Sequence, residues 1–417
     1  MPDVVVIGAG VVGAACAHYA ARAGLDVVVL DRGPVAGGTT GAGEGNVLVS
    51  DKEPGPELDL AVLSAGLWRE LAGLGGFEYE PKGGLVVAED DGVLSALTAL
   101  AAGQGVEHTV VEPGRLADYE PHLAPGFAGG VFYPQDAQVQ PMLAAATLLR
   151  EVTGSARGAG SGTPSLRTGV TVTGFLRDGE RVTGVRTDHG DIPAGAVVNA
   201  AGTWGGEVAA LAGVHLPILP RRGFILVTEP LDEPLVLHKV YTAAYVTNVA
   251  SDSEGLETSA VVEGTPSGPV LIGASRERVG FDRTVSIPVL ERLARQAVEL
   301  FPALAARRVI RAYCGFRPYC PDHLPVIGED PRAPGLYHAC GHEGAGIGLA
   351  PATGHLIAQA LTGVRPGLDL GPFRPDRFEP GRSEHDRAEQ GRSEPGRSGT
   401  GTPANPGTGT GTPAKEG

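Results

Sequence analysis

Glycine residues near the N-terminus have the spacing of a dinucleotide-binding turn. The run Gly8-Ala9-Gly10-Val11-Val12-Gly13 is followed by Asp31, 21 residues after Gly10. In such a turn the first glycine permits a tight bend, the second lets the backbone approach a pyrophosphate, and the third allows close packing of helix on strand. Free N–H groups at the helix N-terminus favour phosphate, and Asp31 can accept hydrogen bonds from a ribose hydroxyl. The spacing predicts a bound dinucleotide; the alternative is a tight turn in an ordinary βαβ unit.

A second glycine-rich loop follows shortly after Asp31 in the sequence. It reads Gly37-Gly38-Thr39-Thr40-Gly41-Ala42-Gly43-Glu44-Gly45-Asn46. Its N–H groups and hydroxyls can follow a long cofactor past the pyrophosphate, which favours FAD over NAD. A flexible linker is the alternative, and it fits less well so close to the nucleotide turn.

The elements that must position these loops form an α/β pattern. Residues 4–7 and 27–30 are β-branched runs typical of buried parallel strands, and the alanine-rich segment 14–23 between them is predicted to be a helix. Two alternating segments flank Asp178-Gly179, which is a hairpin signal. Further strands are expected at 84–88, 196–199, 224–228 and 270–273, and helices at 58–71, 142–151, 288–300 and 346–361.

The order of these elements predicts a domain interrupted by another. A Rossmann-like domain is expected at 1–50, 136–215 and 311–371, and a mixed-sheet, α+β domain at 51–135 and 216–310. After Phe378 the chain has no Leu, Ile, Val, Phe, Met, Tyr or Trp. Such a composition cannot form a core, so a disordered tail is predicted over 372–417.

Composition narrows the range of partners. The 48 acidic and 33 basic residues give a net charge of −15, which argues against nucleic acid or an anionic membrane as partner. The four cysteines form no CxxC pair, and we predict no metal site. With few cysteines, no secretory leader and no apolar run near the ~18 residues of a membrane span, a cytoplasmic protein without an integral membrane segment is expected.

Several segments together resemble a known family. The chain is similar to the D-amino-acid-oxidase-type FAD amine oxidoreductases, which include glycine oxidase, sarcosine oxidase and D-amino acid dehydrogenase, over about residues 3–370. Residues 37–46 resemble the family's flavin-contacting loop, 133–141 the loop returning to the FAD domain, and 197–204 its middle FAD segment. The remaining matches are Gly315-Phe316-Arg317-Pro318 with Pro321-Asp322, and Gly341-His342 through Pro351-Ala352-Thr353-Gly354.

Two segments point to a subgroup. Residues 340–351 and 50–56 resemble the β-type subunits of D-hydroxyproline dehydrogenase, opine oxidase and hydrogen cyanide synthase. Gly344 stands where glycine oxidases often carry a second arginine, which favours a substrate other than that of glycine oxidase itself.

The resemblance implies specific site residues. Arg317 is expected to hold a substrate carboxylate, because a planar guanidinium offers a bidentate pair; a surface salt bridge is the alternative. Tyr241 and Tyr245 are expected over the flavin, and His342 in the site or capping its turn, although all three can equally be structural. The expected FAD contacts are Gly8, Gly10, Val11, Val12, Gly13, Asp31, Arg32, Thr39, Thr40, Gly43, Gly45, Asn46, Val172, Ala200, Gly202, Trp204, Gly341, Gly344, Gly346, Ile347 and Gly348.

The implied activity is oxidation of a C–N bond by hydride transfer to flavin N5, without a side-chain base. Candidate substrates are a D-amino acid, D-proline or hydroxyproline, glycine or an opine. Sarcosine oxidases attach flavin to a cysteine, but the matching position here is Gly315 and not Cys314, so FAD is expected to be non-covalent. The strand around Leu271-Ile272-Gly273 has no lysine to assist reaction with oxygen, which favours a dehydrogenase that passes electrons to a partner subunit or a quinone.

Three alternatives stay open at this point. The protein can be a glycine- or sarcosine-type oxidase that uses oxygen, an NAD-dependent dehydrogenase, or a non-catalytic flavin-carrying subunit. The absorption spectrum of the purified protein separates the NAD alternative from the others, because a flavin has bands in the near-ultraviolet and the blue.

Overall fold

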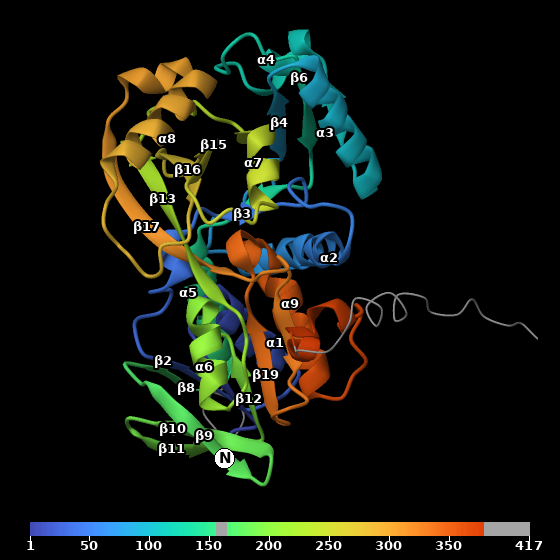
Figure 1. Ribbon diagram of the computed structural model, residues 1–417, viewed down its shortest axis with the longest axis vertical. Coiled ribbons are helices and arrows are strands. Elements are labelled where there is room, and N and C mark those ends of the chain that lie inside the picture. Colours follow the sequence, from blue (N-terminus) through green and yellow to red (C-terminus); the bar gives the residue numbers. More distant parts are fainter. Residues whose placement is uncertain (156–164, 379–417) are drawn as a thin grey trace, which may run out of the picture. The chain divides into compact units, whose positions relative to one another are not determined.

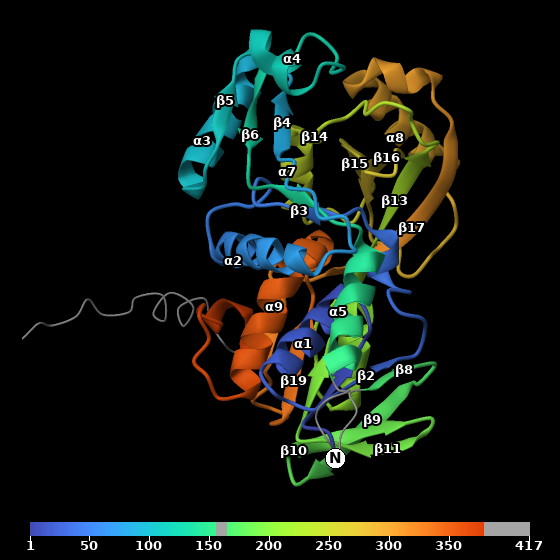
Figure 2. The same ribbon diagram turned by 180° about the vertical axis from the view of Figure 1, so that it is seen from behind.

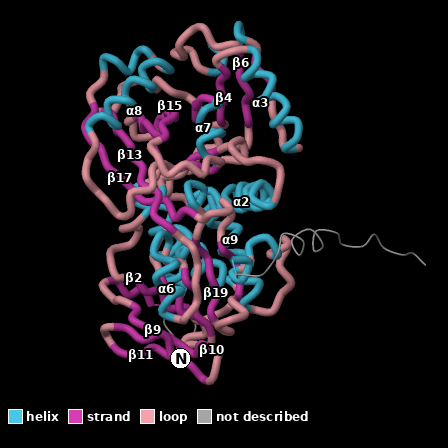
Figure 3. Tube along the Cα trace, in the orientation of Figure 1, coloured by secondary structure: helices cyan, strands magenta, loops and turns pink. Residues whose placement is uncertain are grey.

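A computed structural model describes residues 1–155 and 165–378. Two large sheets dominate the arrangement, which Figures 1 and 2 show from opposite sides and Figure 3 shows by secondary structure. The predicted α/β class with a Rossmann-like domain is confirmed. The predicted tail from 379 onward lies outside the described residues.

The first sheet carries the nucleotide-type turn. Its strands lie in the order β18-β19-β12-β1-β2-β8, all parallel except the β18–β19 pair. Crossovers of this kind place helices on a parallel sheet and bury both faces. The bounds are β1 Val4–Ile7, β2 Val27–Asp31, β8 Ser165–Thr168, β12 Ala196–Asn199, β18 Val326–Glu329 and β19 Leu336–Cys340.

Alternate residues of β1 enter two different cores. Val4 and Val6 pack on the face covered by helices α1, α5 and α9, whereas Val5 and Ile7 pack on the other face. That second face is covered by α6 and the antiparallel sheet β11-β10-β9, visible at the lower end of Figure 1. The bounds are α1 Val11–Arg22, α5 Pro141–Ser155, α6 Gly205–Leu211, α9 Gly346–Leu361, β9 Val172–Asp178, β10 Arg181–Thr187 and β11 Gly190–Pro193.

The second sheet has eight strands in the order β17-β13-β16-β15-β14-β4-β6-β5. Only the β14–β4 pair is parallel. Apolar residues of α8 pack against β13, β15 and β16, while α3 packs on β4 and β6. The bounds are β4 Gly84–Ala88, β5 Thr109–Val111, β6 Gly129–Tyr133, β13 Leu219–Thr228, β14 Lys239–Thr242, β15 Glu257–Gly264, β16 Val270–Arg276, β17 Val309–Tyr319, α3 Asp91–Gln104 and α8 Ile287–Leu300.

Short elements connect the two sheets. Strands β3 (Asn46–Val47) and β7 (Ala137–Gln138) pair with each other, and helix α2 (Pro56–Leu71) packs against α9. Two more helices, α4 (Leu116–Tyr119) and α7 (Ala243–Val249), lie beside the larger sheet, and in Figure 1 the α2 and β3 labels lie between the two sheets. The segments that connect the sheets therefore include the glycine-rich loop that ends at Asn46.

The structure corrects two expected boundaries. Residues 311–319 were assigned to the Rossmann-like domain, but they belong to β17, which pairs with β13 in the larger sheet. Residues 372–378 were assigned to the tail, but Gly371–Phe373 and Pro375–Phe378 form 3-10 turns and Phe373 is fully buried. The sequence hid β17 because its first residues are exposed and it contains Pro318, which is unusual within a strand.

Candidate active site

The turn after β1 depends on glycine at two positions. Gly8 has a φ of +114°, and a Cβ placed there would lie 2.4 Å from the Ala200 carbonyl oxygen. A Cβ at Gly13 would lie 1.9 Å from the Gly8 carbonyl oxygen, so the helix can approach the strand only without it. These constraints match the mechanical roles expected from the sequence. They leave the N-terminus of α1 facing a cavity that Gly10, Val11 and Val12 help to line.

Asp31 holds two turns together. Its carboxylate accepts hydrogen bonds from the Ala9 N–H (2.8 Å) and the Gly33 N–H (2.7 Å). Beside it the Arg32 guanidinium carbon lies 4.5 Å from the centre of the Trp204 ring, which stacks on Phe281. Each carboxylate oxygen keeps a lone pair that can accept from a ribose hydroxyl.

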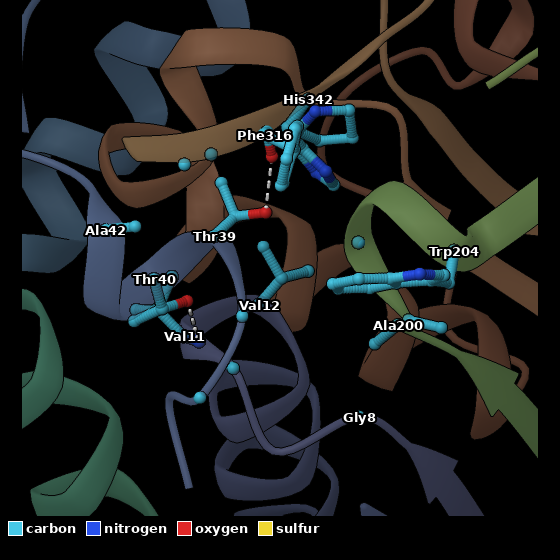
Figure 4. A pocket seen from close by; sticks show the side chains of 18 of the residues that line it. Gly8, Val11, Val12, Thr39, Thr40, Ala42, Ala200, Trp204, Phe316 and His342 are labelled. Carbon is cyan, nitrogen blue, oxygen red and sulfur yellow. Dashed lines mark hydrogen bonds between the residues drawn. The ribbon is translucent and has the colours of Figure 1, made fainter. Parts of the chain in front are cut away.

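Hydroxyl groups tie the glycine-rich loop to both domains. Thr40 Oγ1 accepts from the Val11 N–H at 3.0 Å, and Thr39 Oγ1 donates to the Phe316 carbonyl oxygen of β17 at 2.7 Å. Thr203 donates to the same carbonyl at 2.7 Å. Figure 4 shows the Thr39 and Thr40 bonds, and the Trp204 ring pointing toward Val12. The loop is thus fixed along one side of the cavity.

The cavity has a volume of about 500 Å³ and extends from the nucleotide turn to β17. It reaches the N-terminal ends of α1 and α9, whose N-cap residues make no side-chain hydrogen bond. The Val11 N–H of α1 is taken by Thr40, and the other N–H groups at these two ends can bind an anionic ligand. A dinucleotide fits these residues. The expected site residues that line it are Gly8, Gly10, Val11, Val12, Asp31, Arg32, Thr39, Thr40, Gly43, Asn46, Val172, Ala200, Gly202, Trp204, Tyr245, Arg317, His342, Gly344, Gly346 and Ile347.

Five expected residues lie outside the lining: Gly13, Gly45, Tyr241, Gly341 and Gly348. Gly45 and Gly348 instead permit close backbone contacts, since a Cβ would lie 1.8 Å from the Val139 oxygen and 3.2 Å from the Asn46 oxygen, respectively. The Tyr241 side chain is fully buried, and its hydroxyl forms a 2.5 Å hydrogen bond with the Ser50 hydroxyl. The expected catalytic contact of Tyr241 is therefore not supported, because its hydroxyl is engaged in the core.

Arg317 lies at the far end of the cavity, between two glycines. Its Nη1 donates to the Ser275 carbonyl oxygen at 2.8 Å, which leaves its other N–H groups available. A Cβ at Gly223 would lie 2.1 Å from Nη1, and one at Gly344 would lie 3.5 Å from Nε. Within the described part of the chain, no carboxylate forms an ion pair with Arg317. The guanidinium is held in place by backbone and lacks a counter-charge of its own.

His342 is buried, and its hydrogen bond to Thr353 assigns one tautomer to it. The Thr353 hydroxyl donates to the Leu349 carbonyl at 2.9 Å, so its oxygen must accept from His342 Nε2–H, also at 2.9 Å. Burial lowers the pKa of His342 to about 3. The imidazole therefore stays uncharged near neutral pH and cannot neutralise a substrate carboxylate.

Two further cavity residues had no signal in the sequence. Glu44 is buried, accepts from the Asn46 amide at 3.0 Å, and lies 3.7 Å from the buried Lys239 ammonium. A Cβ at Gly273 would lie 2.2 Å from Glu44 Oε1, so this carboxylate occupies the space beside the strand where lysine was sought and not found. Glu343 binds Arg221 at 2.6 Å and His323 at 2.9 Å. Only the fold brings these partners together.

The cysteine and glycine of β17 face different ways. Gly315 lines the cavity, whereas Cys314 is absent from its lining and its Sγ lies 3.9 Å from the Arg283 carbonyl oxygen. This arrangement supports the prediction of non-covalent FAD. Within residues 1–155 and 165–378, no helix has the length and apolar character needed to cross a bilayer, and no group of His, Cys, Asp and Glu is arranged to hold a metal ion.

Comparisons with known proteins identify the family of this chain. A family described as FAD dependent oxidoreductase (DAO) matches residues 3–360. The chain is 31% identical over 391 residues to glycine oxidase of Pseudomonas putida, covering 90% of this chain and 98% of that protein. It is 30% identical over 434 residues to hydrogen cyanide synthase subunit HcnC of Pseudomonas aeruginosa, covering 91% and 96%. The structure of glycine oxidase from Geobacillus kaustophilus has a TM-score of 0.80 at 27% identity, covering 91% of this chain and 99% of that one.

Proposed function

The chain belongs to the family of FAD-dependent oxidoreductases, with FAD as cofactor, and on this premise we propose that it oxidises the C–N bond of a small amino or imino acid. The observation that carries the proposal is the Arg317 guanidinium, which has no ion-pair partner among the described residues and lines the cavity beside the N-terminus of α9. A substrate carboxylate supplies the missing charge. Bidentate binding fixes the direction of the substrate Cα–H as well as adding affinity.

Each group at this end of the cavity has a separate task. Bound FAD would supply the acceptor for the hydride of the substrate Cα. Ser275 holds Arg317 through its carbonyl oxygen, and the N–H groups at the start of α9 stabilise negative charge that develops nearby. Tyr245 also lines this end and helps to exclude water. The neutral His342 leaves the substrate carboxylate to Arg317.

The proposal is tested by anaerobic mixing of the purified holoenzyme with amino and imino acids, including D-proline, D-hydroxyproline, glycine and sarcosine. Loss of the visible flavin absorbance, without any partner protein, is expected for a substrate. Arg317→Lys is expected to lower kcat/KM at least ~100-fold, mainly through KM, while FAD stays bound, because a lysine cannot reproduce the bidentate pair.

Arg311→Lys is the matched control, because Arg311 is an exposed arginine of the same strand. It is expected to leave kcat/KM unchanged. If Arg317→Lys retains full activity, Arg317 does not bind the carboxylate. If no member of the panel bleaches the flavin, the protein is a passive flavin carrier toward these substrates.

We also propose that the enzyme acts as a dehydrogenase. No lysine is among the described residues that line the cavity with the dinucleotide turn, which supports this proposal. Gly273 of β16, with the Glu44 carboxylate beside it, supports it as well. Reoxidation of the reduced enzyme by a quinone or an artificial dye is expected to be much faster than by oxygen. Faster reoxidation by oxygen identifies an oxidase instead. An electron-accepting partner subunit and a cytoplasmic location stay predictions.

A further inference from the structure

A second cavity adjoins the first at Arg317. Its volume is about 340 Å³, and Tyr245, Arg317, Glu343 and Gly344 line both cavities. Its other walls come from residues 51–57, helix α7, the end of β16, residues 322–324 and Ala345. A ligand held by Arg317 can therefore extend into this second space.

Arg276, the last residue of β16, lines the second cavity and lacks a partner. Its side chain is only 4% exposed, yet none of the described residues forms a hydrogen bond or an ion pair with its guanidinium. The guanidinium carbon lies 5.2 Å from the centre of the Tyr245 ring. Burial, and then the nearby charge of Arg317, lower the pKa of Arg276 to about 10, so it stays charged near neutral pH.

Apart from the exposed Glu53, the acidic side chains of this cavity already have cationic partners, and Glu57 lies 3.6 Å from the Lys52 ammonium. Asp51 binds Lys52 at 2.7 Å, and Glu343 binds Arg221 at 2.6 Å. Asp322 binds Arg377 at 2.7 Å. Against the effect of burial, His323 and Arg221 hold the pKa of Glu343 below its ordinary value, so this carboxylate stays ionised and paired. The two guanidinium groups without a carboxylate partner are thus Arg276 and Arg317.

A buried charge without a partner destabilises the folded protein, because it loses hydration and gains no ion pair. Two such cations along one continuous space are explained by a ligand that brings two negative charges. We propose that Arg276 binds a second carboxylate of the substrate, which makes the substrate an amino or imino dicarboxylate. The inference rests on the proposed function, because it places the first carboxylate on Arg317 and the reacting nitrogen and Cα between the two arginines.

Binding of unreactive analogues tests the second site without turnover. Diglycolate and methoxyacetate are ethers that differ by one carboxylate, and their binding to the holoenzyme is measured from the perturbation of the visible flavin spectrum. Diglycolate is expected to bind at least ~30-fold more tightly. Arg276→Met is expected to remove that difference, whereas Arg317→Met weakens both ligands.

The Arg276→Met variant is expected to fold, because methionine fills a similar volume without a buried charge. Its thermal unfolding temperature and its FAD content check this. Arg276→Gln is the second variant, and it is expected to lose the preference in the same way. Equal binding of the two ethers by the wild-type holoenzyme overturns the inference, and so does a preference that survives both substitutions.

Turnover then locates the second carboxylate within the substrate. Iminodiacetate is compared with sarcosine, and D-glutamate and D-aspartate with D-alanine. A preference for iminodiacetate places the carboxylate on the nitrogen substituent, and a preference for the acidic amino acids places it on the side chain. If diglycolate is preferred but no amine is oxidised, the second site stands and the proposed oxidation fails, so the two failures are distinguishable.

Discussion

Single residues of the site owe their charge state to burial and to one or two neighbours. His342 is neutral because it is buried, and Arg276 stays charged because guanidinium is so basic that even its lowered pKa lies well above 7. Sequence reasoning found Arg317 through its Gly-Phe-Arg-Pro frame, but it could not find Arg276. The sequence around Arg276 does not distinguish it from a surface arginine. Only the structure shows that the neighbouring carboxylates are already paired with other cations.

One contribution to the pH dependence of stability comes from His342. Its pKa is about 3 in the folded protein, below the ordinary 6.5, so the unfolded chain takes up a proton first as the pH falls. The stabilisation is complete above pH 6.5 and is lost progressively from there toward pH 3, at ~1.4 kcal/mol per pH unit for one fully titrating group. The free energy of unfolding, measured in urea with excess FAD between pH 6.5 and 4.5, is expected to fall less steeply in His342→Gln.

His189→Gln is the control for this measurement, because His189 is an exposed histidine. It is expected to keep the wild-type slope. An unchanged slope in His342→Gln shows that the imidazole is protonated in the folded protein after all.

At the scale of elements, the cavity depends on two helices whose backbones approach closely at one glycine. Helices α1 and α9 present their N-terminal residues to the cavity and pack against each other at Gly354. A Cβ at Gly354 would lie 2.5 Å from the Ala15 carbonyl carbon and 2.8 Å from the Cys16 nitrogen, which are backbone atoms of α1. The close contact fixes the separation of the two ligand-facing ends.

Gly354→Ala is therefore expected to move α9 away from α1, because backbone atoms cannot rotate out of the way. We expect a loss of ~2–4 kcal/mol in the free energy of unfolding, together with weaker binding of FAD. Thermal unfolding and FAD titration of the apoprotein measure the two effects.

Gly66→Ala is the matched change in α2, where a Cβ meets nothing within 4 Å. Alanine is the better helix former there, so stability is expected to stay equal or to rise by up to ~1 kcal/mol. Equal behaviour of the two variants contradicts the proposed role of the α1–α9 contact.

Local patterns predicted those elements whose sequence signal is local. The strands at Val4–Ile7, Gly84–Ala88 and Ala196–Asn199 and the helix at Gly346–Leu361 have the bounds expected from the sequence. Strand β17 was not expected as a whole, because Pro318 and its exposed start disguise it. Its place is determined by pairing with β13, far away in the sequence.

At the scale of the whole molecule, the site joins two sheets that the chain builds from interleaved segments. The glycine turns that hold a dinucleotide belong to the first sheet and were recognisable in the sequence. Arg276 ends β16 and Arg317 lies in β17, the two strands that flank β13 in the second sheet, whereas Glu44 lies in the glycine-rich loop before β3. The cofactor could therefore be predicted from the sequence, whereas the substrate side required the pairing of β13, β16 and β17.

Phe373 and Arg377 anchor the last described segment of the chain. Phe373 is fully buried, and Arg377 donates to the Leu324 carbonyl and to the Asp322 carboxylate, both at 2.7 Å.

A chain that ends at Phe378 is expected to keep the wild-type unfolding temperature and kcat/KM, because residues 379–417 contain no large apolar side chain. A chain that ends at Gly371 is expected to lose at least ~3 kcal/mol, since it removes a buried phenylalanine and leaves Asp322 without its partner beside the second cavity. The two truncated chains are compared by their thermal unfolding, which is monitored through the release of FAD. Equal losses for both place a stabilising contact after residue 378, and no loss for either contradicts the role given to Phe373.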